Sequence, residues 1–173
     1  MGLHYQNLDA ATRVFMLYED AMGGHYKSPR IEEGRMPEWL SLFREALANH
    51  SDDWLALEVN SRGLMKHSEL RRTPSGGTTT AKVPHNAAQQ LAEGEFNRYY
   101  LRGIAARALK EGKKSLRVYR GKVVSVPRPD SEAKIGELID AEQLLAELRK
   151  DNFVDNALGL PAGPNSGLTA EIA

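Results

Sequence analysis

The residues that could do chemistry gather in one stretch of the chain. Between positions 96 and 128 the sequence holds ten Lys and Arg side chains and one acidic residue, Glu111. Clustered cations displace counterions from phosphates, and aromatic rings stack on unpaired bases. The pattern predicts a surface for a polyanion or an acidic partner. Its candidate binding residues are Arg98, Arg102, Lys113, Lys114, Arg117, Tyr119, Arg120, Lys122 and Arg128.

The charges of the whole chain are segregated, although the formal net charge is zero. Residues 1–60 carry −5, residues 61–95 carry +2, residues 96–128 carry +9 and residues 129–173 carry −6. Either the basic stretch is neutralised by acidic segments of its own chain or of a neighbouring subunit, or it binds nucleic acid. Charge runs usually meet solvent or an internal partner, so the first interpretation is favoured.

Few residues suggest catalysis. The five histidines never occur as a helical i, i+4 pair and the chain has no cysteine, so the sequence predicts neither a metal site nor a cofactor. Asp130, Glu132 and Lys134 are the residue types of a metal-dependent nuclease. That chemistry needs the two carboxylates on separate strands converging on an ion, and here they nearly abut. A helix start is therefore favoured, with Asp130 or Ser131 as its cap and Glu132 in its first turn, and a nuclease remains a third alternative.

The long helix that carries part of the basic stretch is predicted over residues 86–111. At 100° per residue its small and aromatic side chains share one arc, which should face the core. Glu95, Arg98 and Arg102 fall on the opposite side, where Glu95 can pair with Arg98 and Arg102 is expected to be free for an outside partner. Gly103 and Gly94 are unfavourable within a helix, and the close approach of another backbone would explain them.

Other helices are predicted over residues 8–22, 37–49 and 140–150, with one more following Ser51. In the first of them Val14, Leu17, Tyr18 and Ala21 recur at helical spacing, so they are expected to pack inward.

Residues 115–126 alternate in type and predict one strand with a bulge at Gly121 or a tight hairpin about it. Its partner is expected to be residues 78–83 or a neighbouring subunit. The rest of residues 66–85 is predicted to be a loop rich in Gly, Thr and Pro. Residues 151–173 are expected to form an extended arm that docks on its own domain or on a neighbour.

These elements predict a mainly α fold with a small β element, in the α+β class. A helical segment over residues 1–65 shares one core with residues 86–150. With 41% apolar and 27% charged residues, no transmembrane stretch and no secretion signal, the composition is typical of a soluble globular protein. We expect it in the cytoplasm, with no membrane partner.

Four segments resemble an uncharacterised bacterial and prophage protein family. They are residues 92–103 (AEGEFNRYYLRG), 118–122 (VYRGK), 127–136 (PRPDSEAKIG) and 157–168 (ALGLPAGPNSGL). The family has no established activity. The resemblance implies a mobile-element setting, which favours a virion or assembly role and would extend the location to the virion.

The favoured function is accordingly a non-enzymatic structural or assembly protein, and the resemblance implies that it is phage- or prophage-derived. It would form a homo-oligomer or dock on other subunits through the basic 98–128 surface and the C-terminal arm. Alternating acidic and basic blocks suit head-to-tail association that is sensitive to salt. The alternatives are a nucleic-acid-binding module that uses the same surface, and the metal-dependent nuclease.

Overall fold

The computed structural model describes residues 2–150, 153–161 and 165–173. Their fold is mainly α with two small antiparallel sheets, as the sequence predicts. The elements in chain order are α1 (Ala10–Met22), α2 (Met36–Asn49), α3 (Asp52–Ser61), β1 (Ser68–Arg72), β2 (Thr78–Lys82), α4 (Ala87–Lys110), β3 (Ser115–Arg120), α5 (Pro129–Lys134), β4 (Leu138–Asp140), α6 (Ala141–Arg149), α7 (Val154–Ala157) and β5 (Leu168–Ile172).

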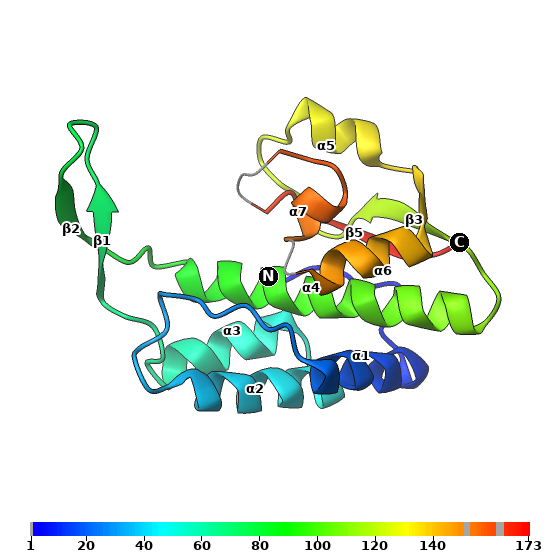
Figure 1. The fold of residues 1–173 in the computed structure, drawn as a ribbon, viewed down its shortest axis with the longest axis horizontal. Coiled ribbons are helices and arrows are strands. Elements are labelled where there is room, and N and C mark those ends of the chain that lie inside the picture. The colour runs from blue at the N-terminus through cyan, green and yellow to red at the C-terminus, as the bar shows by residue number, and fades with distance from the viewer. Residues whose placement is uncertain (1, 151–152, 162–164) are drawn as a thin grey trace.

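The long helix α4 runs through the middle of the molecule between two layers. Helices α1, α2 and α3 cover one side of it, and α6, α7 and the sheet that contains β3 and β5 cover the other (Figure 1). Every residue from Glu95 to Ala105 is buried as a result. The prediction of a single buried arc on this helix is therefore wrong, because a helix covered from both sides has no solvent face.

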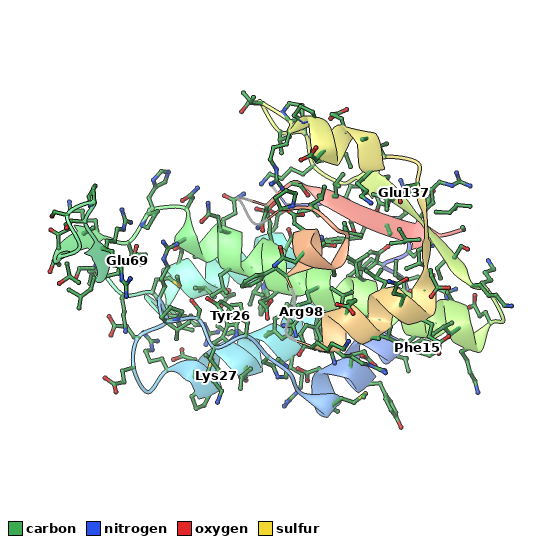
Figure 2. All side chains as sticks on the ribbon, turned by 45° about the horizontal axis from the view of Figure 1, so that its top comes forward. Phe15, Tyr26, Lys27, Glu69, Arg98 and Glu137 are labelled. Atoms are coloured by element: carbon green, nitrogen blue, oxygen red, sulfur yellow. The ribbon has the colours of Figure 1, made fainter. Side chains whose placement is uncertain are left out.

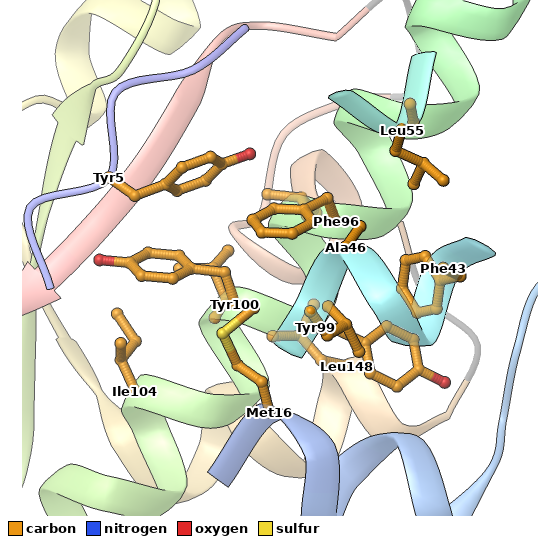
Figure 3. Packing of buried hydrophobic residues seen from close by; sticks show 14 of the residues in the cluster. Tyr5, Met16, Phe43, Ala46, Leu55, Phe96, Tyr99, Tyr100, Ile104 and Leu148 are labelled. Carbon is orange, nitrogen blue, oxygen red and sulfur yellow. The ribbon is translucent and has the colours of Figure 1, made fainter. Parts of the chain in front are cut away.

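Aromatic side chains join the two layers through α4. The Tyr5 and Tyr100 rings lie 4.7 Å apart on one side, and the Phe43 and Tyr99 rings meet edge to face at 5.0 Å on the other (Figure 3). Such tilted and edge-to-face pairs add about 1 kcal/mol each beyond the area they bury. Consecutive residues of one helix, Tyr99 and Tyr100, thus anchor opposite halves of the core.

The strand expected over residues 115–126 ends at Arg120, and it is the central strand of the order β4-β3-β5. Its partners are β4 and β5, both antiparallel, instead of residues 78–83. Gly121 follows the strand and donates its N–H to the carbonyl of Gly167, so neither the bulge nor the hairpin is formed there. The partners of β3 could not be predicted from its own sequence, because nothing in a short strand specifies a partner that lies far away in the sequence.

The segment predicted as a loop over residues 66–85 contains a β-hairpin. Strands β1 and β2 pair in register from Ser68↔Lys82 to Arg72↔Thr78, and Gly76 takes a positive φ of 90° in the connecting turn. The expected extended stretch at residues 78–83 corresponds to β2. The sequence does not predict the partner strand β1, because the residues of β1, Ser-Glu-Leu-Arg-Arg, include no β-branched side chain.

The expected C-terminal arm forms regular elements where it is described. Residues 154–157 form α7 and residues 168–172 form β5, while residues 151–152 and 162–164 lie outside the described part. The Asn97 amide donates to the Leu168 carbonyl, and Thr169 Oγ1 donates to Asn97 Oδ1. These bonds fasten β5 to α4, so this part of the arm belongs to the core of its own chain.

The helix start expected in this segment is formed, and helix α5 begins at Pro129. Arg128 occupies the N-cap position, whereas Asp130 and Ser131 lie inside the helix, so the expected cap is wrong.

Among the described residues, no helix is long and apolar enough to cross a lipid bilayer.

The N-terminal segment is held by a buried carboxylate. Asp52, at the start of α3, accepts the Leu3 N–H at 3.0 Å through Oδ2, and its Oδ1 is buried without a partner among the described atoms. Burial raises the pKa of Asp52 to about 6. The folded protein therefore holds a proton at this group more tightly than the unfolded chain does.

Substituting Asp52→Asn should change how stability depends on pH. Because the folded pKa is raised, the free energy of unfolding of the natural protein should fall by about 2 kcal/mol relative to the variant as pH rises from about 4 to 7. Urea unfolding across this range measures the difference. Asp130→Asn, at an exposed carboxylate in the first turn of α5, is the control. Parallel curves for Asp52→Asn and the natural protein would contradict the assignment.

Gly103 and Gly94 should respond in opposite ways to alanine. A Cβ at position 103 would lie 2.6 Å from Met16 Cγ and 3.2 Å from the Met16 backbone nitrogen, whereas at position 94 its nearest neighbour is the Asn165 amide at 3.6 Å. The predicted close backbone approach is confirmed at Gly103 alone. We expect Gly103→Ala to destabilise the fold by about 1–2 kcal/mol. Gly94→Ala should be neutral or stabilising by up to about 1 kcal/mol in thermal or urea unfolding.

Candidate functional site

Two of the predicted binding residues lie in the interior. Arg98 and Arg102 are each 1% exposed on α4, and Arg98 lies at the centre of the molecule (Figure 2). The prediction that Arg102 is free for an outside partner is wrong. Its guanidinium contacts α1, which lies far away in the sequence.

The partner of Arg102 is the buried carboxylate of Glu19. Arg102 Nε donates to Glu19 Oε1 at 2.9 Å, and Arg149 from the end of α6 donates to both oxygens of the same carboxylate at 2.9 and 2.7 Å. Burial alone would raise the pKa of Glu19, but the hydrogen bonds from Arg149 and Arg102 outweigh it and lower the pKa. The charged carboxylate of Glu19 therefore joins α1, α4 and α6.

Arg98 secures the chain that follows α1. It donates to the carbonyls of Gly24 and Leu148, and Nη1 lies 3.0 Å from Glu95 Oε1. The predicted Glu95–Arg98 pair therefore forms, although it is buried. Burial outweighs the attraction of Arg98 and raises the pKa of Glu95. Glu95 also accepts the Tyr26 N–H, so this pair fixes the path of residues 24–26 across α4.

Half of the eight remaining Lys and Arg side chains of the basic stretch are paired with carboxylates of the same chain. Arg107 contacts Asp9 and Glu111. Three more of the predicted binding residues are neutralised in the same way. These pairs are Arg120 with Glu132, Lys122 with Glu93, and Arg128 with Asp155.

Tyr119 is also engaged within the chain. Its hydroxyl donates to the carbonyl of His4 and accepts the N–H of Gln6, so it holds the N-terminal segment to β3. Lys113, Lys114 and Arg117 remain exposed and make no ion pair with the residues that the structure describes. The nine predicted residues therefore do not form one surface. The favoured interpretation, neutralisation by acidic segments of the same chain, accounts for most of the stretch.

The nuclease residues do not converge on a common point. Glu132 pairs with Arg120, and Lys134 pairs with Glu137 on the far side of the short helix α5. Within the ranges described, His, Asp and Glu form no group of three that could hold a metal ion.

A cleft of about 460 Å³ lies between α4 and the segment that follows α1. Two carboxylates, Glu69 and Glu95, contribute to its lining, and both are occupied by arginines of the same chain. Arg30 and Arg71 bind the first, and Arg98 binds the second. These acids act as ion-pair partners that hold the walls of the cleft in place.

Helix α1 is amphipathic in the reverse of the expected sense. Its charged residues face the protein: Glu19 and Asp20 are buried, and Arg13 donates to carbonyls at the end of α2. His25 and Arg44 bind Asp20, and these contacts outweigh its burial and lower its pKa. The buried apolar anchor of the helix is Met16, which packs on Gly103.

Apolar side chains cover the side of α1 that faces solvent. Val14 is 64% exposed, Tyr18 is 72% exposed and Met22 is 55% exposed. The prediction of inward packing is wrong for Val14, Tyr18 and Ala21, because ion pairs to arginines on α4, α6 and α2 orient the acidic side of the helix toward the core. Leu17 is partly buried and does pack against the core. We call this surface the outer face of α1. It consists of Ala11, Val14, Tyr18, Ala21 and Met22.

The outer face of α1 is the candidate functional site. Periodicity could locate the apolar stripe but could not tell which side it faces, since the arginines that bind Glu19 and Asp20 lie elsewhere in the sequence. An exposed apolar helix face marks an interaction surface more often than a catalytic one. No protein-family model matches the chain, and no curated protein or solved structure is significantly similar to it.

Arg102→Met should show how much the fold depends on the buried ion pairs. Removing this guanidinium leaves Glu19 buried with Arg149 alone, and we expect a loss of about 3 kcal/mol in the free energy of unfolding. Arg107→Met is the matched control on the same helix. Because its carboxylate partners are more exposed, that variant should lose less than about 1 kcal/mol. Equal losses in urea unfolding would contradict the role of the Glu19 pair.

Proposed function

We propose that this protein is a structural or assembly protein that associates with a second copy of itself through the outer face of α1. The observation that carries the proposal is the reversed orientation of that helix. Its acids are buried in ion pairs while Val14, Tyr18 and Met22 face solvent. Apolar area removed from water contributes about 25 cal/mol per Å², so covering this face would stabilise a complex.

A second copy suits the face because of its lack of charge. In a two-fold dimer each surface meets an identical surface, so a charged face would place like charges together. The outer face of α1 presents small, aliphatic and aromatic side chains, which pack against their own kind without repulsion. Tyr18 offers an amphipathic ring of the type enriched at interfaces.

The face is also held firmly enough for recognition. Three contacts fix α1: Glu19 to Arg102, Asp20 to Arg44, and Arg13 to the carbonyls that end α2. A helix ordered in this way loses little further freedom on binding, and preorganisation of this kind favours affinity.

The proposed interface differs from the expected one in its physical basis. Association through the basic 98–128 surface and the C-terminal arm would be ionic and weakened by salt. Much of that surface is neutralised within the chain, and β5 is part of the sheet. An apolar α1 interface should instead be insensitive to salt or strengthened by it. We place such an assembly in the cytoplasm, or in a virion if the chain is phage-derived.

Val14→Glu and Tyr18→Glu test the interface. Each buries a charge in the proposed dimer while lying on the solvent side of the folded monomer, so each should raise the dissociation constant by at least about tenfold. Sedimentation equilibrium of the full chain at several salt concentrations measures it. Val123→Glu is the control, because Val123 is 91% exposed in the segment after β3.

The natural protein should dimerise, and the Val123→Glu variant should do so equally well. A natural protein that stays monomeric at high concentration would overturn the proposal. Dimerisation unaffected by Val14→Glu and Tyr18→Glu would exclude α1 as the interface.

A further inference from the structure

The β1–β2 hairpin projects beyond the end of α4, away from both layers (Figure 1). It forms a separate two-stranded sheet, and most of its residues are exposed. A two-stranded sheet alone has little stability in water, so a hairpin that does not contribute to the core calls for another role. The two faces of the hairpin differ in their side chains.

One face is tied to the body of the protein. The register places Glu69 and Arg71 on the same face of the hairpin, where Ala81 and Thr79 are their cross-strand neighbours. Glu69 accepts from Arg30 at 2.8 and 3.1 Å, and Arg71 binds the same carboxylate at 2.9 and 2.8 Å. This carboxylate therefore sets the direction of the hairpin.

The opposite face is basic and carries hydroxyl groups. Residues Ser68, Leu70 and Arg72 of β1 share it with Thr78, Thr80 and Lys82 of β2, and Lys66, which precedes β1, extends it at the base of the hairpin, where it lines a cleft together with Ser68 and Lys82. We call this surface the ribbon face. Its cations, Lys66, Arg72 and Lys82, form no ion pair within the described ranges. The only acid of the hairpin, Glu69, lies on the other side.

The ribbon face leads into a cleft of about 570 Å³ at its base. Lys66, Ser68 and Lys82 belong to both, and the cleft is further lined by His67 and His85. Ala88 places the first turn of α4 at the same cleft. That turn has no acidic residue and no side-chain cap, so its N–H groups add a partial positive charge.

We propose that the ribbon face and this cleft bind the phosphodiester backbone of a nucleic acid. Lys, Arg, Ser and Thr are the side chains that most often contact phosphate oxygens. Strand β1, from Ser68 to Arg72, is about 13 Å long, which matches roughly four nucleotide steps. A two-stranded ribbon also fits a groove of duplex DNA. The face lacks the aromatic anchors typical of protein interfaces, which favours nucleic acid over an acidic protein.

A second exposed basic cluster provides a matched control. Lys110 is the last residue of α4, and Lys113 and Lys114 follow it. This end of the 24-residue helix lies about 36 Å from the end beside the hairpin. Changing three lysines there alters the total charge as much as changing the ribbon does. Nucleic-acid binding at the ribbon does not require self-association through α1, so the two proposals fail independently.

The experiment uses the full chain and three labelled probes: duplex DNA, single-stranded DNA and single-stranded RNA. Fluorescence anisotropy is measured over a salt series for the natural protein, for a ribbon variant and for a helix-end control. The ribbon variant combines Lys66→Gln, Arg72→Gln and Lys82→Gln. The control combines Lys110→Gln, Lys113→Gln and Lys114→Gln. Circular dichroism confirms that each is folded, and Arg72→Gln alone serves if the triple variant is not.

The natural protein should bind at least one probe, and its affinity should fall with salt. Removing three phosphate contacts should reduce the slope of log K against log salt by roughly two to three units and the affinity by more than about tenfold. The helix-end control should keep most of its affinity. The probe that binds best identifies the form of nucleic acid.

Three outcomes would overturn the proposal. The first is no binding of any probe at low salt. The second is an equal loss in the ribbon variant and the control, which would mean that only total charge matters. The third is that poly-glutamate binds as tightly as the nucleic-acid probes and loses affinity to the same extent in the ribbon variant, which would assign the face to acidic polypeptides.

Discussion

The buried carboxylate of Glu19 and the arginines that hold it determine the rest of the structure. Arg102 from α4 and Arg149 from α6 meet on this one side chain of α1, so elements from three parts of the chain are joined at a single charged point. A buried charge is strongly unfavourable when unpaired, and this dependence fixes which side of α1 faces inward. The exposed apolar face of that helix follows from the same constraint.

Much of the fold could be predicted from the sequence, because its strongest signals are local. Helical periodicity located α1, α2, α4 and α6 to within a few residues. The strand partners could not be predicted, because β3 pairs with β5 although α5, β4, α6 and α7 lie between them in the sequence. Pairing of this kind depends on contacts that no local window contains.

The candidate site was harder to predict than the fold, for a related reason. Val14 and Tyr18 have the spacing of core residues, and only the positions of Arg102 and Arg44 show that the polar side of their helix is the buried one. The basic stretch misleads in the same way. Its cations are adjacent in the sequence but are divided in space between the core, internal ion pairs and one exposed end of α4.

The position of α4 between two layers has a consequence for synthesis. The layer formed by α1, α2 and α3 precedes α4 along the chain, whereas β5 and α6 follow it. A nascent chain that has just completed α4 has made the whole of one layer but, for the other side, only the N-terminal segment that carries Tyr5. The side of α4 that carries Tyr100 lacks the cover of α6 and β5 until those elements have been made. In that interval the chain needs protection from aggregation, and native packing of α4 is completed only after β5 has left the ribosome.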